Sequence, residues 1–226
     1  MTDFSSNGFI HRYRFWLVFI LAAALLQIPI ISIPFKWFES YFHEISHGLA
    51  AIATGGAIVK IELFPNGAGL CTTMGGSRFF TSFMGYAGAA IWGMLLYASA
   101  SYHQRMAQVV HVLVAGLLVC SLLLWVRDSL TFVIVAILLS IVLLKFKYSH
   151  AAYLQFSMQI LGALVLINSL YSPFYLLAYN QQGDSATLAS LTLIPELMWI
   201  AIWFSIGVAS MVFLAKNDRV KRSSVS

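Results

Sequence analysis

Long apolar runs constrain this chain more than any other feature of its sequence. A helix needs about 20 mostly apolar residues to cross a bilayer. Seven such runs lie at residues 15–34, 36–54, 79–101, 106–126, 128–146, 150–177 and 187–215. Only 9% of the residues are charged, whereas soluble domains have about 25%. Such a chain cannot cover a water-facing surface, so we predict an all-α polytopic membrane protein with six to seven transmembrane helices.

The connections between these runs are short, so we expect a single integral-membrane domain over residues 1–226. Positive charges gather beside the first and last runs, in HRYR (residues 11–14) and KNDRVKR (residues 216–222). A net charge of +5 placed in this way indicates membrane flanks rather than nucleic-acid binding. Both clusters favour the cytoplasmic side, which requires an even number of spans. The sequence therefore predicts that one run does not cross, or that one cluster misleads.

A segment after the second run breaks the apolar pattern. In residues 57–76, apolar positions alternate with Lys60 and Glu62, which is the period of a strand. The turn sequence PNG follows at 65–67, and residues 70–74 can return as a second strand. Open strand edges are tolerated in a membrane only inside protein or beside a watery cavity. We therefore predict a short β-hairpin beside a cavity. Its edge can pair with an extended substrate, or the hairpin can seal the cavity as a re-entrant plug.

The stretch HEISH, within the second run, carries the strongest chemical signal. His43 and His47 are four residues apart, so on a helix they lie on one face and can chelate one metal ion. Glu44 follows the first histidine and borders the ion instead of binding it. This is the HExxH pattern of zinc proteases, in which the glutamate is the general base and the metal activates water. Ionisable residues in a membrane are costly, which favours a functional role for these.

A catalytic zinc ion usually has three protein ligands, so a third must come from elsewhere. Glu39 shares the helix face of the histidines but would have to reach past His43, which suits a supporting role. Glu62 is expected to face the cavity, and Asp128 to pair with Arg127 at a membrane boundary. The remaining acids considered are Glu196, in the last run, and Asp184, in the polar patch at residues 179–190. We favour Asp184, and expect Asp184 or Ser185 to cap the last helix.

These residues resemble a known family. HEISHGLAAIATGG (residues 43–56) is similar to the HExxH helix of site-2-protease-like intramembrane zinc metalloproteases, above all their small bacterial M-fifty-B-like branch. Members of this branch follow the helix with a short hairpin, matched by residues 57–76, and a glycine-rich span, matched by GYAGAAIWG (residues 85–93). They also carry an Asp-containing patch before a Trp-rich helix, matched by residues 183–203. The LDG motif of the better-known site-2 proteases is absent.

The resemblance implies zinc ligands His43, His47 and Asp184, with Glu44 as the base. It implies hydrolysis of membrane-embedded or membrane-proximal protein substrates, in a bacterial inner membrane. In the glycine-rich span, Gly85, Ala89 and Gly93 have the spacing for close helix packing, and we expect them to face the metal-bearing helix.

Two other functions fit parts of the pattern. A pseudoprotease would keep the fold as a membrane-binding factor, but loss of Glu44 would be its expected mark. A proton or metal transporter would use the buried His and Glu residues, but would need polar residues along several spans. Cys71 and Cys120 lie in apolar surroundings and are expected to be free thiols.

Overall fold

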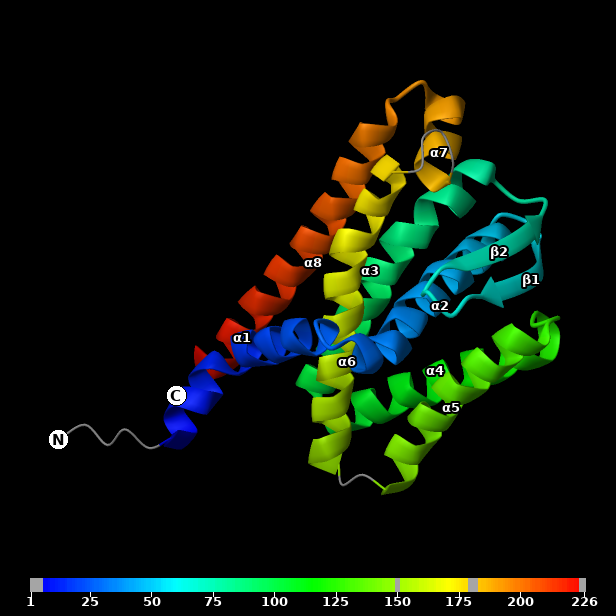
Figure 1. Cartoon of the computed structure of the whole chain (residues 1–226). Coiled ribbons are helices and arrows are strands. Elements are labelled where there is room, and N and C mark those ends of the chain that lie inside the picture. Colours follow the sequence, from blue (N-terminus) through cyan, green and yellow to red (C-terminus); the bar gives the residue numbers. More distant parts are fainter. Residues whose placement is uncertain (1–5, 149–150, 179–182, 224–226) are drawn as a thin grey trace.

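The computed structural model describes residues 6–148, 151–178 and 183–223. Most of them are helical, and one two-stranded sheet follows the second helix (Figure 1). The elements in chain order are α1 (Ser6–Leu26), α2 (Pro29–Ala53), β1 (Ala57–Leu63), β2 (Gly69–Met74), α3 (Arg78–Tyr102), α4 (Gln104–Leu124), α5 (Ser129–Tyr148), α6 (Ala151–Tyr171), the 3-10 helix η1 (Ser172–Ala178), α7 (Asp184–Thr192) and α8 (Glu196–Ser223). The predicted helical architecture with a hairpin after the HExxH helix is therefore confirmed.

Four of the described helices are long and apolar enough to cross a membrane: α3, α4, α6 with its continuation into η1, and α8. The count rises to five if α1 and α2 are one span, broken by a bend of 109°. The predicted six to seven spans are not confirmed. The predicted runs at 15–34 and 36–54 both fall in the bent pair. The run at 128–146 gives a shorter apolar helix, Ser129–Leu144, in the described part of α5.

A proline sets the position of the bend. Pro29 is the first residue of α2, and Ile28 before it has extended backbone, as a residue that precedes proline prefers. Pro34, where the first predicted run ends, lies inside α2. The helix boundary therefore comes earlier than the sequence analysis predicts, because the proline that begins the second helix is the first of the two.

The predicted last span, residues 187–215, is also two helices. Leu193 ends α7 in the left-handed backbone region, with φ of 62°. Pro195 follows, and α8 begins at Glu196. Since a proline disfavours helical backbone in the residue before it, the chain cannot continue straight from α7 into α8.

Helix α3 is central to the bundle and packs most extensively against α6 and α2 (Figure 1). Its glycines divide between these neighbours. A Cβ at Gly85 would lie 2.5 Å from the Nε2 atom of His47 on α2, whereas a Cβ at Gly93 would lie 2.7 Å from the backbone nitrogen of Leu166 on α6. Only a glycine permits such approaches. The prediction of one glycine face against the metal-bearing helix is thus correct for Gly85 and wrong for Gly93.

The hairpin has one covered edge and one free edge. β1 and β2 pair antiparallel, with Ile61 opposite Cys71. On the far side of β1, the Ile61 N–H donates to the carbonyl of Trp125 at 3.0 Å, and the Leu63 N–H donates to the hydroxyl of Thr131 at 3.0 Å. The connection between α4 and α5 and the start of α5 therefore close this edge. Within the described residues, no backbone group of another element bonds to the outer edge of β2, where the Cys71 N–H faces the carboxylate of Glu44.

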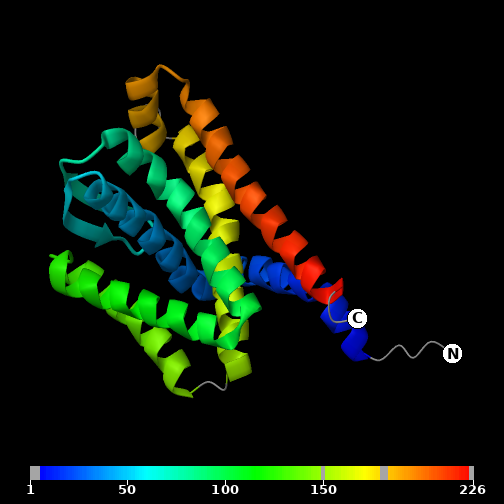
Figure 2. The same cartoon turned by 180° about the vertical axis from the view of Figure 1, so that it is seen from behind.

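The start of α1 and the end of α8 lie at the same end of the bundle, away from the hairpin and α7 (Figures 1 and 2). HRYR and KNDRVKR belong to these two segments, so both clusters are at one end, as their shared charge predicts. The two runs at 15–34 and 36–54 form a single bent unit between this end and the hairpin. Two of the seven predicted runs therefore belong to one bent pair of helices.

Candidate metal centre

Helix α2 carries both predicted histidine ligands and the predicted base. His43 and His47 are one turn apart, and their Nε2 atoms lie 2.9 Å from each other. Glu44 is buried, with 5% of its surface exposed, and lies beside this pair. This is the one-sided arrangement that residues at positions i and i+4 adopt on a helix.

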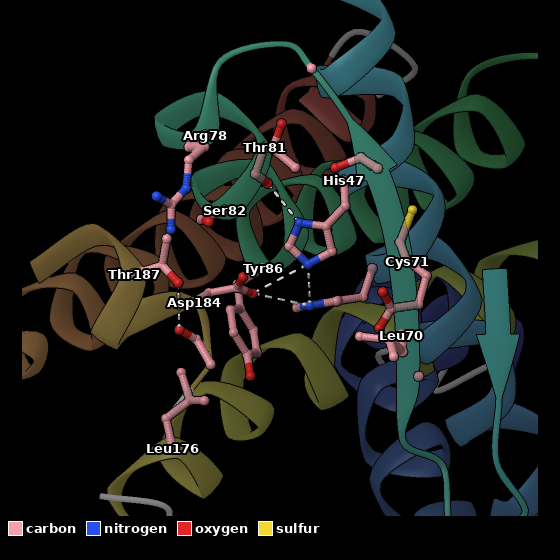
Figure 3. Close-up of a pocket in the computed structure, with 16 residues that line it drawn as sticks. His47, Leu70, Cys71, Arg78, Thr81, Ser82, Tyr86, Leu176, Asp184 and Thr187 are labelled. Atoms are coloured by element: carbon pink, nitrogen blue, oxygen red, sulfur yellow. Dashed lines mark hydrogen bonds and ion pairs between the residues drawn. The ribbon is translucent and has the colours of Figure 1, made fainter. Parts of the chain in front are cut away.

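Asp184 joins the histidines from the other end of the chain (Figure 3). Its Oδ2 atom lies 3.4 Å from Nε2 of His43 and 3.3 Å from Nε2 of His47. The expectation that Asp184 or Ser185 caps a helix is wrong, because Gly183 occupies the N-cap position of α7 and no side chain caps it. Asp184 is the first residue of α7, and its carboxylate faces the histidines instead.

Contacts with α3 and α8 hold α7 in place. Leu188 is fully buried against Ala87 of α3 and Trp199 and Trp203 of α8. The hydroxyl of Ser185, which is also fully buried, donates to Oε2 of Glu196 at 2.9 Å. Tertiary packing, and not the local sequence, therefore brings the aspartate to the HExxH helix.

The three side chains fit a divalent metal ion in chemistry and in spacing. Two imidazoles and a carboxylate form a common donor set of catalytic zinc sites. Donor atoms at about 2.0–2.1 Å from one tetrahedral ion lie roughly 3.3 Å from each other. The two distances from carboxylate to imidazole are 3.3 and 3.4 Å, and all three donor atoms lie within 4.8 Å of one another. The structure thus brings together the three residues that the sequence analysis names as ligands.

Neighbouring groups prepare these side chains to bind a cation. The Nδ1 atom of His47 lies 2.6 Å from the carbonyl oxygen of Thr81. A carbonyl can only accept, so Nδ1 donates to it, which orients the ring with Nε2 toward His43 and Asp184. Burial alone would raise the pKa of Asp184, but the imidazoles of His47 and His43 outweigh burial and hold this pKa well below its usual range. Asp184 is therefore a carboxylate, as a metal ligand must be.

Strand β2 passes directly over Glu44. A Cβ at Gly69 would lie 2.6 Å from the Oε1 atom of Glu44, so only a glycine leaves room for this carboxylate. Cys71 lines the same cavity, where burial and then the charge of Glu44 raise the pKa of its thiol to about 12. The thiol therefore stays protonated, and both cysteines are free, as predicted.

Two of the other acidic candidates bond to serines near the site. Glu39 is buried and accepts a hydrogen bond from the hydroxyl of Ser172 at 3.0 Å. Glu196 accepts one from Ser185 and does not line the cavity. Neither belongs to the group of possible metal ligands found among the described residues.

The remaining two acids lie away from the site. Glu62 forms an ion pair with Lys60 at 2.9 Å and does not line the cavity, contrary to expectation. Asp128 accepts a hydrogen bond from the backbone N–H of Thr131 at 2.8 Å, at the start of α5. The predicted pair between Asp128 and Arg127 is not formed, because Arg127 donates to backbone carbonyls instead.

The three possible ligands and Glu44 line a cavity of about 420 Å³ between α2, β2, α3 and α7 (Figure 3). One wall, which the sequence analysis missed, comes from Arg78, Thr81, Ser82 and Tyr86 of α3. The ring of Tyr86 packs edge-on against His43, with 4.4 Å between centroids. These four residues recur at helical spacing on one face of an apolar run, and this pattern in the sequence could have predicted a polar wall.

Comparison with known proteins gives one match. A family model described as Peptidase M50B-like matches residues 16–214. No curated protein and no solved structure was found to match the chain. The matched range includes His43, Glu44, His47 and Asp184.

Proposed function

Because the chain belongs to the Peptidase M50B-like family, we propose that it is an intramembrane zinc metalloprotease. Its substrates are membrane-embedded or membrane-proximal proteins, and its location is a bacterial inner membrane. The observation that carries the proposal is the convergence of His43, His47 and Asp184 in one cavity with Glu44 beside them.

His43, His47 and Asp184 would hold the zinc ion, which when bound acidifies water and polarises the carbonyl of the scissile peptide. Glu44 takes the proton of the attacking water and delivers it to the leaving amine. Gly69 leaves room for the carboxylate of Glu44, which would have to move if a side chain were present on β2.

The free edge of β2 is suited to hold the substrate. The N–H groups of Ile61 and Leu63 point away from β2, so their cross-strand partners Cys71 and Gly69 point their backbone groups away from β1. Both partners line the cavity. An unwound substrate that pairs with this edge would pass beside Glu44.

The two rival functions receive less support. A pseudoprotease has no need of the base, yet Glu44 is present and buried at the site. A transporter needs a polar path across the membrane. The polar residues that line the cavity come from α2, β2, α3 and α7, which meet at one end of the bundle (Figure 1).

Metal content and peptide cleavage, measured on the detergent-purified protein, test the proposal. Wild type and Glu44→Gln should each hold about one zinc per chain, whereas His43→Ala and Asp184→Ala should lose it. Only wild type should cleave. Absence of zinc from wild type under metal-replete conditions would refute the protease. Zinc retained in Asp184→Ala would assign the third ligand to another acid.

A further inference from the structure

Arg78 is a cation in the cavity with no acidic partner among the described residues. It is the first residue of α3, lines the cavity that holds the metal group, and is exposed. It is the only lysine or arginine among the described residues that line this cavity. The described part of the chain contains no ion pair or hydrogen bond from the Arg78 side chain. A cation that only marked the membrane boundary would need no place in the cavity wall.

Ser82 lies one helical turn after Arg78 on the same face of α3 (Figure 3). Ser82 is nine-tenths buried, with 9% of its surface exposed, and lines the cavity. Its hydroxyl has no hydrogen-bond partner among the residues described. The hydroxyl of Thr81 beside it is buried and also lacks a partner there. Buried polar groups are normally bonded, so unpaired ones in a cavity indicate a missing ligand.

We propose that Arg78 and Ser82 form a subsite for a carboxylate of the substrate peptide. This inference rests on the proposed protease function, whose substrate class it narrows. A guanidinium can donate two parallel hydrogen bonds to a carboxylate, and the serine hydroxyl adds a third donor. The carboxylates of Glu44 and Asp184 elsewhere in the cavity are assigned to the base and to the metal, which leaves the charge of Arg78 for the substrate.

The helix fixes how far this subsite lies from the reaction. Gly85, where an added Cβ would meet both histidines, is seven residues after Arg78, or about 10 Å along α3. An extended peptide advances about 3.3 Å per residue. The recognised carboxylate therefore lies about three residues from the scissile bond. It belongs either to an acidic side chain or to the C-terminus of the substrate.

Binding to the Glu44→Gln protein tests the subsite without any cleavage. The probes are fluorescein-labelled peptides derived from one parent sequence, added to the zinc-containing protein in detergent. One series is amidated at its C-terminus and carries Glu or Gln at single positions along the chain. A second series has only Gln and ends in a free carboxylate at varied positions. Fluorescence anisotropy measures each Kd.

A correctly placed carboxylate should tighten Kd by about tenfold to a hundredfold, the usual range for a hydrogen-bonded charge. Arg78→Gln should abolish this preference, and Ser82→Ala should reduce it. Arg105→Gln removes a cation of α4 outside the cavity, and this variant should keep the preference for the carboxylate. Tighter binding in the amidated Glu series would show that the recognised carboxylate belongs to a side chain. Tighter binding in the second series would show that it is the C-terminus of the peptide.

Equal Kd values for all peptides on the Glu44→Gln protein, in which Arg78 is unchanged, would overturn the subsite. So would an equal loss of preference in Arg105→Gln. Thermal unfolding of each variant shows whether it is folded, and Arg78→Lys, which keeps the charge, should retain part of the preference. Cleavage by the protein with Glu44 intact separates the two proposals. Cleavage without carboxylate preference refutes the subsite alone, whereas preferential binding without cleavage of any peptide refutes the protease alone.

Discussion

Substitution of Gly85 by alanine would test the contact between α3 and the two histidines. A Cβ at this position would lie 2.5 Å from Nε2 of His47 and 2.7 Å from Nε2 of His43. Ordinary van der Waals contact begins at 3.4 Å, so the rings must retreat by about 1 Å or the helices must part. The ring of His47 has little freedom to turn, because its Nδ1 atom donates to Thr81.

The expected effect on metal binding is large. Disturbing the groups that orient a metal ligand lowers affinity by about tenfold to a hundredfold, and overpacking a buried contact costs about 1–3 kcal/mol of stability. Because the new methyl group meets both histidines at their donor atoms, we expect the upper end, about a hundredfold weaker zinc binding. Competition with a chromophoric chelator in detergent measures this affinity, and thermal unfolding measures the stability.

Two glycines of the same chain serve as controls. Gly88→Ala places its methyl group against Ser46 in the same interface between α2 and α3, so it should destabilise the protein with a much smaller loss of zinc affinity. Gly116→Ala on α4 meets nothing within 4 Å and should leave zinc affinity unchanged. If Gly85→Ala bound zinc as tightly as Gly88→Ala, the histidine donor atoms would not face α3, and the geometry of the centre would be wrong.

Three further changes probe other parts of the structure. Gly69→Ala should displace the carboxylate of Glu44 and lower kcat by about a hundredfold while zinc content is unchanged, because the methyl group meets the base and not the ligands. Ser185→Ala removes the donor to Glu196 and loosens α7, so zinc affinity should fall by about tenfold, with unaltered affinity refuting this anchoring role. Asp128→Ala removes the hydrogen bond at the start of α5 and should cost about 1 kcal/mol in chemical denaturation. Partial burial would raise the pKa of Asp128, but hydrogen bonds at the start of α5 lower this pKa overall. The ionised Asp128 therefore stabilises the folded protein at pH values above its unfolded-state pKa. This stabilisation is lost as the pH falls through the lowered pKa of the folded protein.

Local patterns were enough to predict the HExxH face and the hairpin. His43 and His47 need only four residues of helix to meet, and the strands are specified by alternation and the turn at residues 65–67. The bend was misplaced because apolarity continues through both Pro29 and Pro34, and either proline is compatible with the first turn of a helix. Hydropathy alone does not distinguish the two.

The sequence allowed the acids to be ranked as third ligand, but no spacing rule could single one out. Asp184 lies far along the chain from His47, and it reaches the site because Leu188 and Ser185 dock α7 on α3 and α8. No local pattern encodes that docking. The role of Arg78 was equally hidden, since an arginine at the start of an apolar run first suggests a membrane flank.

The covered edge of β1 also affects whether copies of this protein can aggregate through their hairpins. An isolated hairpin with two open edges could join the hairpins of other copies into a growing ladder, a route to aggregation in crowded membranes. The carbonyl of Trp125 and the hydroxyl of Thr131 occupy one edge, so any ladder stops after a single added strand. Two copies that paired through their free edges would block each other's cavities and end the assembly as a closed dimer. The hydrogen bonds from Ile61 to Trp125 and from Leu63 to Thr131 therefore oppose growth of such a ladder through the edge of β1.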